Sequence, residues 1–176
     1  MNIRFFNEGP HLLDSTIKAL RRDRLYIPTA VDYPDHDRWL FEKVIPGIES
    51  GDKHSVVCVE YDGVGSSEPI AAIVYQQSQE NPLDLEIKNV SVAPEVWGRE
   101  IGRCALAQVI KYGPGEFSKD INSVVVDTKE TNLAMMAFLK SCGFVVTDEA
   151  VNSRLGHNGV PDVLLRRPLD LNKHRF

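Results

Sequence analysis

Two glycines and two arginines stand within six residues of one another, at Gly98, Arg99, Gly102 and Arg103. Glycine lets an anion approach the backbone N–H groups closely, and arginine adds positive charge and several N–H donors. Together these residue types are typical of a phosphate or pyrophosphate site. An ordinary turn with surface arginines would use the same residues, so the elements around them have to support the assignment.

These four residues lie between a predicted strand and a predicted helix. Val90 and Val92 alternate with polar residues, which predicts a half-buried strand that ends at Pro94. After Gly102, apolar residues at helical spacing predict a helix as far as Tyr112. They are Cys104, Ala105, Leu106, Val109 and Ile110. The first N–H groups of a helix have no partner within it and carry about half a positive charge, so this end of the helix favours a bound anion.

Two motifs in this region resemble those of the GNAT superfamily of acyl-CoA-dependent N-acetyltransferases. The segment 90–94, Val-Ser-Val-Ala-Pro, followed by 97–102, Trp-Gly-Arg-Glu-Ile-Gly, is similar to the family's pantetheine- and pyrophosphate-binding motif. The second motif is Asn132-Leu133-Ala134, then a helix to Cys142, then Gly143-Phe144. The resemblance extends from about Leu83 to Phe144. Two motifs in this order, with a strand between them, are more specific than either alone.

The resemblance implies that acetyl-CoA is the cosubstrate. The backbone of Val90 and Val92 would pair with the pantetheine arm, and the N–H of Val92 would stabilise the oxyanion of the reaction. The pyrophosphate would lie on the amides from Gly98 to Arg103. The cofactor-binding residues implied in this way are Val90, Val92, Trp97, Gly98, Arg99, Glu100, Ile101, Gly102, Arg103 and Asn132.

Transfer of an acetyl group to an amine also needs a base, because an alkyl amine is protonated at neutral pH. Glu86 lies six residues before Val92 on the same predicted strand, and the resemblance implies that a glutamate here acts as the general base. An exposed strand carboxylate without a catalytic role is the alternative. Asp84 and Asp127 are weaker candidates for the base. Asn132 is suited both to capping the helix that follows it and to contacting the cofactor.

Three residues depart from the family pattern. Trp97 replaces the usual basic or amide residue of the loop, and Glu100 replaces its second glycine and brings a negative charge beside the predicted pyrophosphate. Leu139 occupies the position of the tyrosine that commonly protonates the departing thiolate, and it has no proton to give. A CoA thiolate can leave without a positioned acid, since the pKa of a thiol is about 8.5.

The predicted function is that of an N-acetyltransferase in which a primary amine of a small molecule or a peptide attacks acetyl-CoA directly. A catalytically inactive GNAT-fold module that binds acyl-CoA or a protein partner is the alternative, because of the three departures. A different class of nucleotide-binding protein is not favoured, since the loop fits neither common glycine-rich phosphate motif.

The resemblance implies that residues 24–39 and 152–162 read the acceptor. The acidic residues of the first segment could favour a cationic acceptor, and the alternative is that they form a solvated surface loop. Dimers are common in the family, so the resemblance is compatible with a homodimer.

The order of the predicted elements favours a mixed α/β fold. Strands are predicted at 2–6, 54–61, 69–76, 83–92, 121–128, 144–147 and 160–168, and further helices at 11–24, 35–48 and 133–141. Pro46 is expected to kink or split the second helix, and the change of phase between Ile87 and Val90 predicts a β-bulge. The glycines and proline within 112–120 predict a loop. The resemblance implies a mixed, mostly antiparallel twisted sheet of about seven strands, with about four helices on both faces.

The 176 residues are expected to form one domain, 1–170, with a C-terminal tail at 171–176. The formal net charge is −5, so the chain does not have the excess of basic residues typical of nucleic-acid-binding proteins.

Cys58, Cys104 and Cys142 are expected to be buried free thiols, and their spacing does not suggest a metal site. No apolar run reaches membrane-spanning length and no signal region is apparent, so we expect a cytoplasmic protein without a membrane partner.

Overall fold

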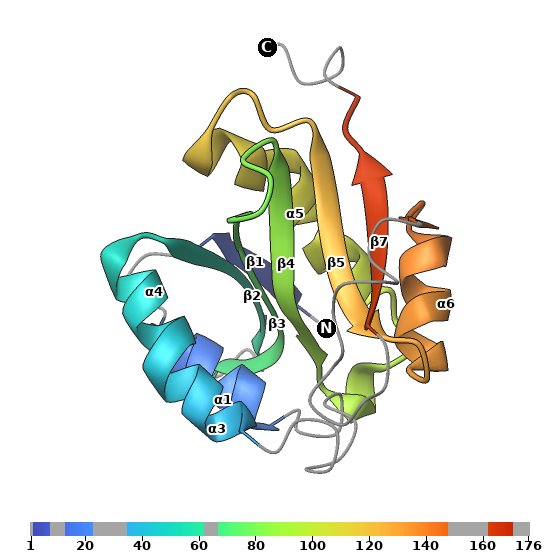
Figure 1. Ribbon diagram of the computed structural model, residues 1–176. Helices are drawn as coiled ribbons and strands as arrows, with labels where there is room; N and C mark the ends of the chain where they lie inside the picture. The colour runs from blue at the N-terminus through green and yellow to red at the C-terminus, as the bar shows by residue number, and fades with distance from the viewer. Residues whose placement is uncertain (1, 8–12, 23–34, 62–66, 148–161, 171–176) are drawn as a thin grey trace.

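The computed structural model describes residues 2–7, 13–22, 35–61, 67–147 and 162–170. Within these ranges the strands form one seven-stranded sheet in the order β1-β2-β3-β4-β5-β7-β6 (Figure 1). They are β1 (Asn2–Asn7), β2 (Lys53–Tyr61), β3 (Ser67–Gln77), β4 (Asp84–Val92), β5 (Ser123–Lys129), β6 (Val145–Val146) and β7 (Asp162–Pro168). Neighbouring strands are antiparallel except β4 and β5, which are parallel. The predicted mixed, mostly antiparallel sheet is confirmed.

Helices cover both faces of the sheet. One face carries α1 (Leu13–Arg22) and a continuous segment of α3 (His36–Trp39), η3 (Leu40–Val44) and α4 (Ile45–Ser50), packed over β2 and β3 (Figure 1). The opposite face carries α5 (Ile101–Phe117) and α6 (Leu133–Ser141). A short turn, η4 (Pro94–Val96), follows β4. With the α3–α4 segment counted once, the described residues contain four helices, as predicted.

The second predicted helix contains a π-helical turn just before Pro46. Pro46 lies in the first turn of α4, directly after the π-helical turn η3. Proline is tolerated in a first turn because the N–H of that position has no partner within the helix. α4 ends at Gly51, whose φ of 83° lies in the left-handed region that favours glycine. The backbone stays helical from α3 through η3 into α4, so Pro46 does not split this helix, and the irregularity before it is a π-helical turn.

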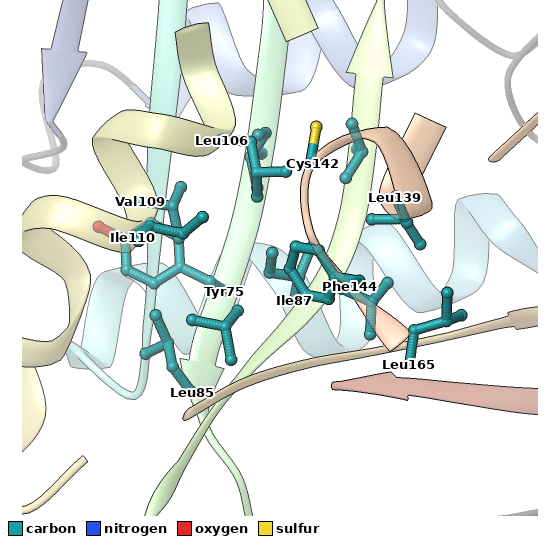
Figure 2. Close-up of a cluster of buried hydrophobic side chains, with 14 of the residues drawn as sticks. Tyr75, Leu85, Ile87, Leu106, Val109, Ile110, Leu139, Cys142, Phe144 and Leu165 are labelled. Atoms are coloured by element: carbon teal, nitrogen blue, oxygen red, sulfur yellow. The ribbon is translucent and has the colours of Figure 1, made fainter. Parts of the chain in front are cut away.

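The main core lies between the sheet and helices α5 and α6 (Figure 2). Its labelled side chains are Tyr75, Leu85, Ile87, Leu106, Val109, Ile110, Leu139, Cys142, Phe144 and Leu165. Burial of each large apolar side chain of this kind contributes about 1.5–3 kcal/mol. The core therefore fixes α5 against β3 and β4, and with it the start of α5, where the predicted phosphate site lies.

A β-bulge in β4 keeps the apolar side chains of that strand on the core face. Val74 pairs with Asn89 and Tyr75 pairs with Ile87, so Lys88 is the extra residue. The insertion resets the two-residue alternation. As a result Ile87 and Val90, three residues apart, both belong to the main core. The predicted bulge is confirmed.

The prediction of a loop over residues 112–120 is wrong, because α5 continues to Phe117. Gly113 permits this, since a Cβ there would lie 2.9 Å from Leu85 Cδ2 and 3.0 Å from Tyr75 Cε2. Beyond it, Tyr75 Oη donates a hydrogen bond of 2.8 Å to Glu116 Oε2. Glycine and proline lower the intrinsic helix propensity of this turn. Here close packing on the sheet outweighs that propensity.

The remaining boundaries differ by a few residues. β3 begins at Ser67, two residues earlier than predicted, because Ser67 pairs with Tyr61. β6 is shorter than the predicted strand 144–147, and Phe144 before it is buried in the core. Most of the two segments predicted to read the acceptor, 24–39 and 152–162, lies outside the described residues, as do the start of the last strand, both ends of the first helix and the C-terminal tail.

Candidate active site

The sheet opens between its two parallel strands. β4 and β5 pair from Asp84↔Ser123 to Ile87↔Val126, and no register pair follows, although β4 continues to Val92. The Lys88 bulge lies at the point where pairing stops. Backbone groups that face this gap lack a neighbouring strand, so an extended ligand with amide groups could pair with them.

A cavity of about 220 Å³ lies at the end of the gap. It is lined by Val90, Val92, Val96, Trp97, Gly98, Glu100, Ile101, Gly102, Arg103, Phe138 and Ser141. We call it the cofactor pocket. Eight of the ten predicted cofactor-binding residues line it, whereas Arg99 and Asn132 do not. Sequence reasoning missed Val96, Phe138 and Ser141. The last two lie one turn apart on α6, but the sequence does not show which face of α6 turns toward α5.

The Trp97 side chain is held in place by a hydrogen bond of its indole. Its Nε1 donates a hydrogen bond of 2.8 Å to the carbonyl oxygen of Val92, and half of the side chain is exposed. The indole therefore closes the end of β4 and forms one wall of the pocket. The N–H of Val92, the predicted oxyanion donor, is a different group from the carbonyl that Trp97 binds.

Glu100 and Arg103 form an ion pair at the start of α5. Glu100 has a φ of 61°, and it is the one residue other than glycine with a positive φ among the described residues. Its carboxylate contacts the Arg103 guanidinium, which also donates to the carbonyl oxygen and to Oγ of Ser141. Glu100, which stands where the family has its second glycine, thus adopts a left-handed backbone conformation whose strain costs about 1–3 kcal/mol. Its carboxylate also places a negative charge beside Arg103.

Gly102 is required for space. A Cβ there would lie 3.2 Å from Val92 Cγ2 and 3.4 Å from Phe138 Cζ. This glycine therefore keeps the pocket open between β4, α5 and α6. The N–H groups of residues 101–103 form the first turn of α5, where they have no acceptor within the helix. They can bind an anion, as the sequence predicts.

Glu86 belongs to a buried polar cluster on the other face of β4. Its side chain accepts a hydrogen bond of 3.0 Å from Gln76 Nε2 and lies 2.9 Å from Lys88 Nζ. Gln76 Oε1 in turn accepts a hydrogen bond from Lys53 Nζ. We call Lys53, Gln76, Glu86 and Lys88 the Glu86 cluster. Glu86 is 7% exposed, so the expectation that it could be an exposed carboxylate is wrong, while its role as the base stays a prediction.

The two weaker candidates for the base differ in their surroundings. Asp84 is 3% exposed and binds Arg166 Nη1 at 2.6 Å, Ser123 Oγ and Asn81 Nδ2. These contacts join β4, β5 and β7, so the role of Asp84 is to stabilise the sheet. Asp127 is half-buried on β5, one residue beyond the last β4–β5 pair.

Two residues of the second motif have structural roles. Asn132 is the N-cap of α6, and its Oδ1 accepts a hydrogen bond of 3.2 Å from Met135 N. Leu139 is fully buried in the core and cannot reach a leaving group. Contact of Asn132 with a cofactor remains a prediction.

The cysteines are free, but one prediction about them is wrong. Cys58 and Cys142 are buried, whereas Cys104 is exposed on α5. Burial raises the pKa of the Cys58 thiol to about 12, with smaller effects from Cys104 and Glu60. In the described part of the chain, no group of three potential metal-binding side chains comes together, and no helix could cross a membrane.

The fold of this chain matches those of solved acetyltransferases. PaiA N-acetyltransferase from Thermoplasma acidophilum, solved in complex with coenzyme A, has a TM-score of 0.71 and 16% identity over 96% of this chain and 99% of that one. Spermidine N-acetyltransferase from Vibrio cholerae, solved with CoA and spermine, has a TM-score of 0.66 and 15% identity over 95% of each chain. The ribosomal-protein-S18-alanine N-acetyltransferase from Escherichia coli has a TM-score of 0.63 and 13% identity over 96% and 94%.

At these identities the likeness establishes the fold. The family is established by sequence, because the model of the acetyltransferase (GNAT) family matches residues 15–144. The chain therefore belongs to the GNAT acetyltransferase family. The comparison with curated proteins found no matching sequence.

Proposed function

We propose that the protein transfers an acetyl group from acetyl-CoA to a primary amine of a small molecule or a peptide, by direct attack in a ternary complex. The observation that carries the proposal is the opening between β4 and β5, which leads into the cofactor pocket at the first turn of α5. Membership of the GNAT family supports the same chemistry.

The residues around the pocket fit acetyl-CoA, which supplies the activated acetyl group. Val90 and Val92 offer backbone groups at the gap, where the pantetheine amides would pair. The N–H groups of residues 101–103 and the side chain of Arg103 offer positive charge for the pyrophosphate. Glu100 opposes this, because its carboxylate already contacts Arg103. Arg103 can therefore contribute to pyrophosphate binding only if it exchanges the Glu100 carboxylate for a phosphate oxygen.

Glu86 is the proposed general base. The amine nitrogen forms a bond to the thioester carbon while Glu86 accepts its proton, and the C–S bond then breaks. The backbone N–H of Val92 stabilises the intermediate oxyanion, and such a donor contributes about 3–4 kcal/mol. Since Leu139 is buried, the thiolate leaves without a protein acid and takes its proton from water. Lys88 Nζ lies 2.9 Å from Glu86 Oε1, but a carboxylate has about four acceptor sites, so lone pairs remain to receive the proton.

A second candidate is a GNAT-fold module that binds acyl-CoA or a protein partner without catalysis. The Glu100–Arg103 ion pair and the buried Leu139 favour it. The acceptor amine, a homodimer and a cytoplasmic location stay predictions. Spermine in the Vibrio cholerae neighbour shows that this fold can bind a polyamine, and a small amine is therefore a reasonable first acceptor to test.

Calorimetry of acetyl-CoA binding tests the proposal, with Gly102→Glu as the test variant and Gly115→Glu as its control. Both glycines lie in α5, but a side chain at Gly102 enters the pocket, whereas a Cβ at Gly115 meets no atom within 4 Å. We expect micromolar binding that Gly102→Glu weakens by about 100-fold or more and Gly115→Glu leaves unchanged.

The result separates the two candidates. Absence of binding at millimolar acetyl-CoA would refute both the enzyme and the acyl-CoA-binding module and would direct the search to protein partners. Binding that Gly102→Glu abolishes, followed by CoA release in the presence of an amine panel, supports the enzyme. Binding without CoA release from any amine in the panel supports the module.

A further inference from the structure

A second cavity, of about 680 Å³, lies where α4 meets the start of β2 and the end of β3. It shares no lining residue with the cofactor pocket. Lys53 and Gln76 line it, so it opens directly onto the Glu86 cluster. We call it the Lys53 pocket. It is large enough for a small organic molecule.

Lys53 is held in the pocket by its stem. A Cβ on Gly47 would lie 2.8 Å from Lys53 Cγ and Cδ, so the absence of a side chain at Gly47 gives the stem its place. The ammonium donates to the amide oxygen of Gln76, which is neutral. Burial lowers the pKa of Lys53, and the charge of Lys88 lowers it further. A bound anion in direct contact with the ammonium would relieve part of this cost of burial.

The acidic residues of the pocket are engaged elsewhere. Glu42 forms an ion pair of 3.0 Å with Arg38 on the surface. Asp52 accepts a hydrogen bond of 2.7 Å from Ser50 Oγ, although its charge still partly offsets that of Lys53. Lys43 also lines the cavity. Lys53 is therefore a half-buried ammonium whose direct partner, the Gln76 amide, carries no opposite charge, while the charges of Glu86 and Asp52 offset part of its own.

Gln76 joins this pocket to Glu86. The residue is 6% exposed, and its amide is oriented by two contacts, because Oε1 accepts from Lys53 and Nε2 donates to Glu86 Oε2 at 3.0 Å. A ligand that draws the Lys53 ammonium toward itself removes one of these contacts. The Gln76 amide is then free to turn, and the hydrogen bond to Glu86 changes with it.

We propose that the Lys53 pocket binds a small-molecule carboxylate through the Lys53 ammonium, and that Gln76 transmits its presence to Glu86. The carboxylate belongs either to the acceptor itself or to a separate effector. The binding step is independent of the proposed acetyltransferase activity, whereas an effect on catalysis rests on it.

Three five-carbon probes of similar length test the binding step on the unaltered protein: glutarate, glutaramide and 1,5-diaminopentane. Calorimetry without acetyl-CoA is expected to show saturable binding of glutarate, and weaker binding of the neutral and the cationic probe. The affinity for glutarate should fall about tenfold or more in Lys53→Met, which keeps an apolar stem but removes the charge. Lys43→Met, a substitution at another lysine of the pocket, should change that affinity by less than about threefold.

The side-chain amide signals of Gln76 in a ¹⁵N–¹H spectrum report the coupling. They should shift on addition of glutarate to the unaltered protein and not to Lys53→Met. The proposal would be overturned if 1,5-diaminopentane bound more tightly than glutarate, if Lys53→Met bound glutarate as well as the unaltered protein, or if no probe bound. Because these readouts need no turnover, failure of the proposed enzyme activity does not affect them.

Kinetics then identify the source of the carboxylate. Glutarate that raises the KM for the acceptor places the carboxylate on the acceptor itself. Glutarate that alters kcat at saturating acceptor makes it a separate effector. An unchanged KM and kcat, in a protein that binds glutarate, would refute transmission to Glu86.

Discussion

The cofactor pocket and the Glu86 cluster share strand β4, but they are built in opposite ways. The pocket offers backbone N–H groups, and its loop side chains Trp97, Glu100 and Arg103 are about half-exposed or more. Glu86 and Gln76 are buried side chains that hold one another in place. A site whose ligand contacts come from backbone groups tolerates substitutions of its loop side chains, which explains how Trp97 and Glu100 can depart from the family pattern. A site whose contacts come from buried side chains does not tolerate substitution of those side chains.

The sharpest contrast comes from Glu86→Gln. If Glu86 is the base, kcat should fall by about 100- to 10,000-fold, while the affinity for acetyl-CoA stays the same. Asp127→Asn, at the half-buried carboxylate across the gap, is the control and should retain most activity. Steady-state rates with a responsive amine and calorimetry of acetyl-CoA provide the two readouts. A larger loss in Asp127→Asn would assign the base to that residue instead.

Asp84→Asn tests whether the buried charges on this side of β4 hold the sheet together. Loss of the carboxylate leaves Arg166 and Ser123 with a neutral partner. We expect the free energy of unfolding in urea to fall by about 2–3 kcal/mol. The exposed pair Arg38–Glu42 is the matched control, and Glu42→Gln should cost about 0.5 kcal/mol or less. Equal losses in the two variants would contradict the contrast between buried and exposed charge.

The far end of α5 gives a pH-dependent test. Burial alone raises the pKa of Glu116, but hydrogen bonds from His54 and Tyr75 outweigh burial and lower it. The stabilisation is therefore present above the ordinary glutamate pKa of about 4.3 and is lost as the pH falls through the lowered value. Glu116→Gln should destabilise the protein by about 1–2 kcal/mol at pH 7.

That difference should shrink as the pH falls below about 4, because the wild-type carboxylate then also becomes neutral. Urea unfolding across this pH range measures it, and Glu49→Gln, at an exposed position, serves as the control. A difference between wild type and Glu116→Gln that did not change with pH would show that the Glu116 charge has no part in stability.

The smallest effects are expected in the loop. Glu100→Gln removes the negative charge beside Arg103 and should strengthen acetyl-CoA binding by about two- to fivefold, since exposed ion pairs contribute less than about 1 kcal/mol. Glu100→Gly should do the same and should also stabilise the protein by about 1 kcal/mol, because glycine adopts a φ of 61° without strain. Calorimetry and thermal unfolding separate charge from strain. Weaker binding in both variants would show that Glu100 supports the pocket.

The sequence predicted those features that depend on local pattern. The order of the strands along the chain and the bulge at Lys88 follow from the periodicity of apolar residues. The residues of the glycine loop were predicted from their motif, and most of them line one cavity. These signals are contained in a few consecutive residues, so they can be read without the fold.

The remainder depends on contacts between distant segments. The continuation of α5 through Gly113 is set by Tyr75 and Leu85 on the sheet, which a local reading of glycine and proline does not include. The exposure of Cys104 depends on which face of α5 packs. The burial of Glu86 by Gln76 and Lys53 needs three strands in register. No local pattern contains this information.

The gap between β4 and β5 has a consequence for the order in which the molecule opens. It divides the sheet into an antiparallel meander, β1 to β4, and a second group, β5, β7 and β6, which four parallel residue pairs join at this point. Groups of this kind open as separate cooperative units in native-state hydrogen exchange. We expect the amides of β5 to exchange through an opening that leaves β2 and β3 protected. A ligand that binds in the gap only while these strands are closed would slow that exchange by the factor 1 + L/Kd, where L is the free ligand concentration, so the cosubstrate would complete the sheet as well as react on it.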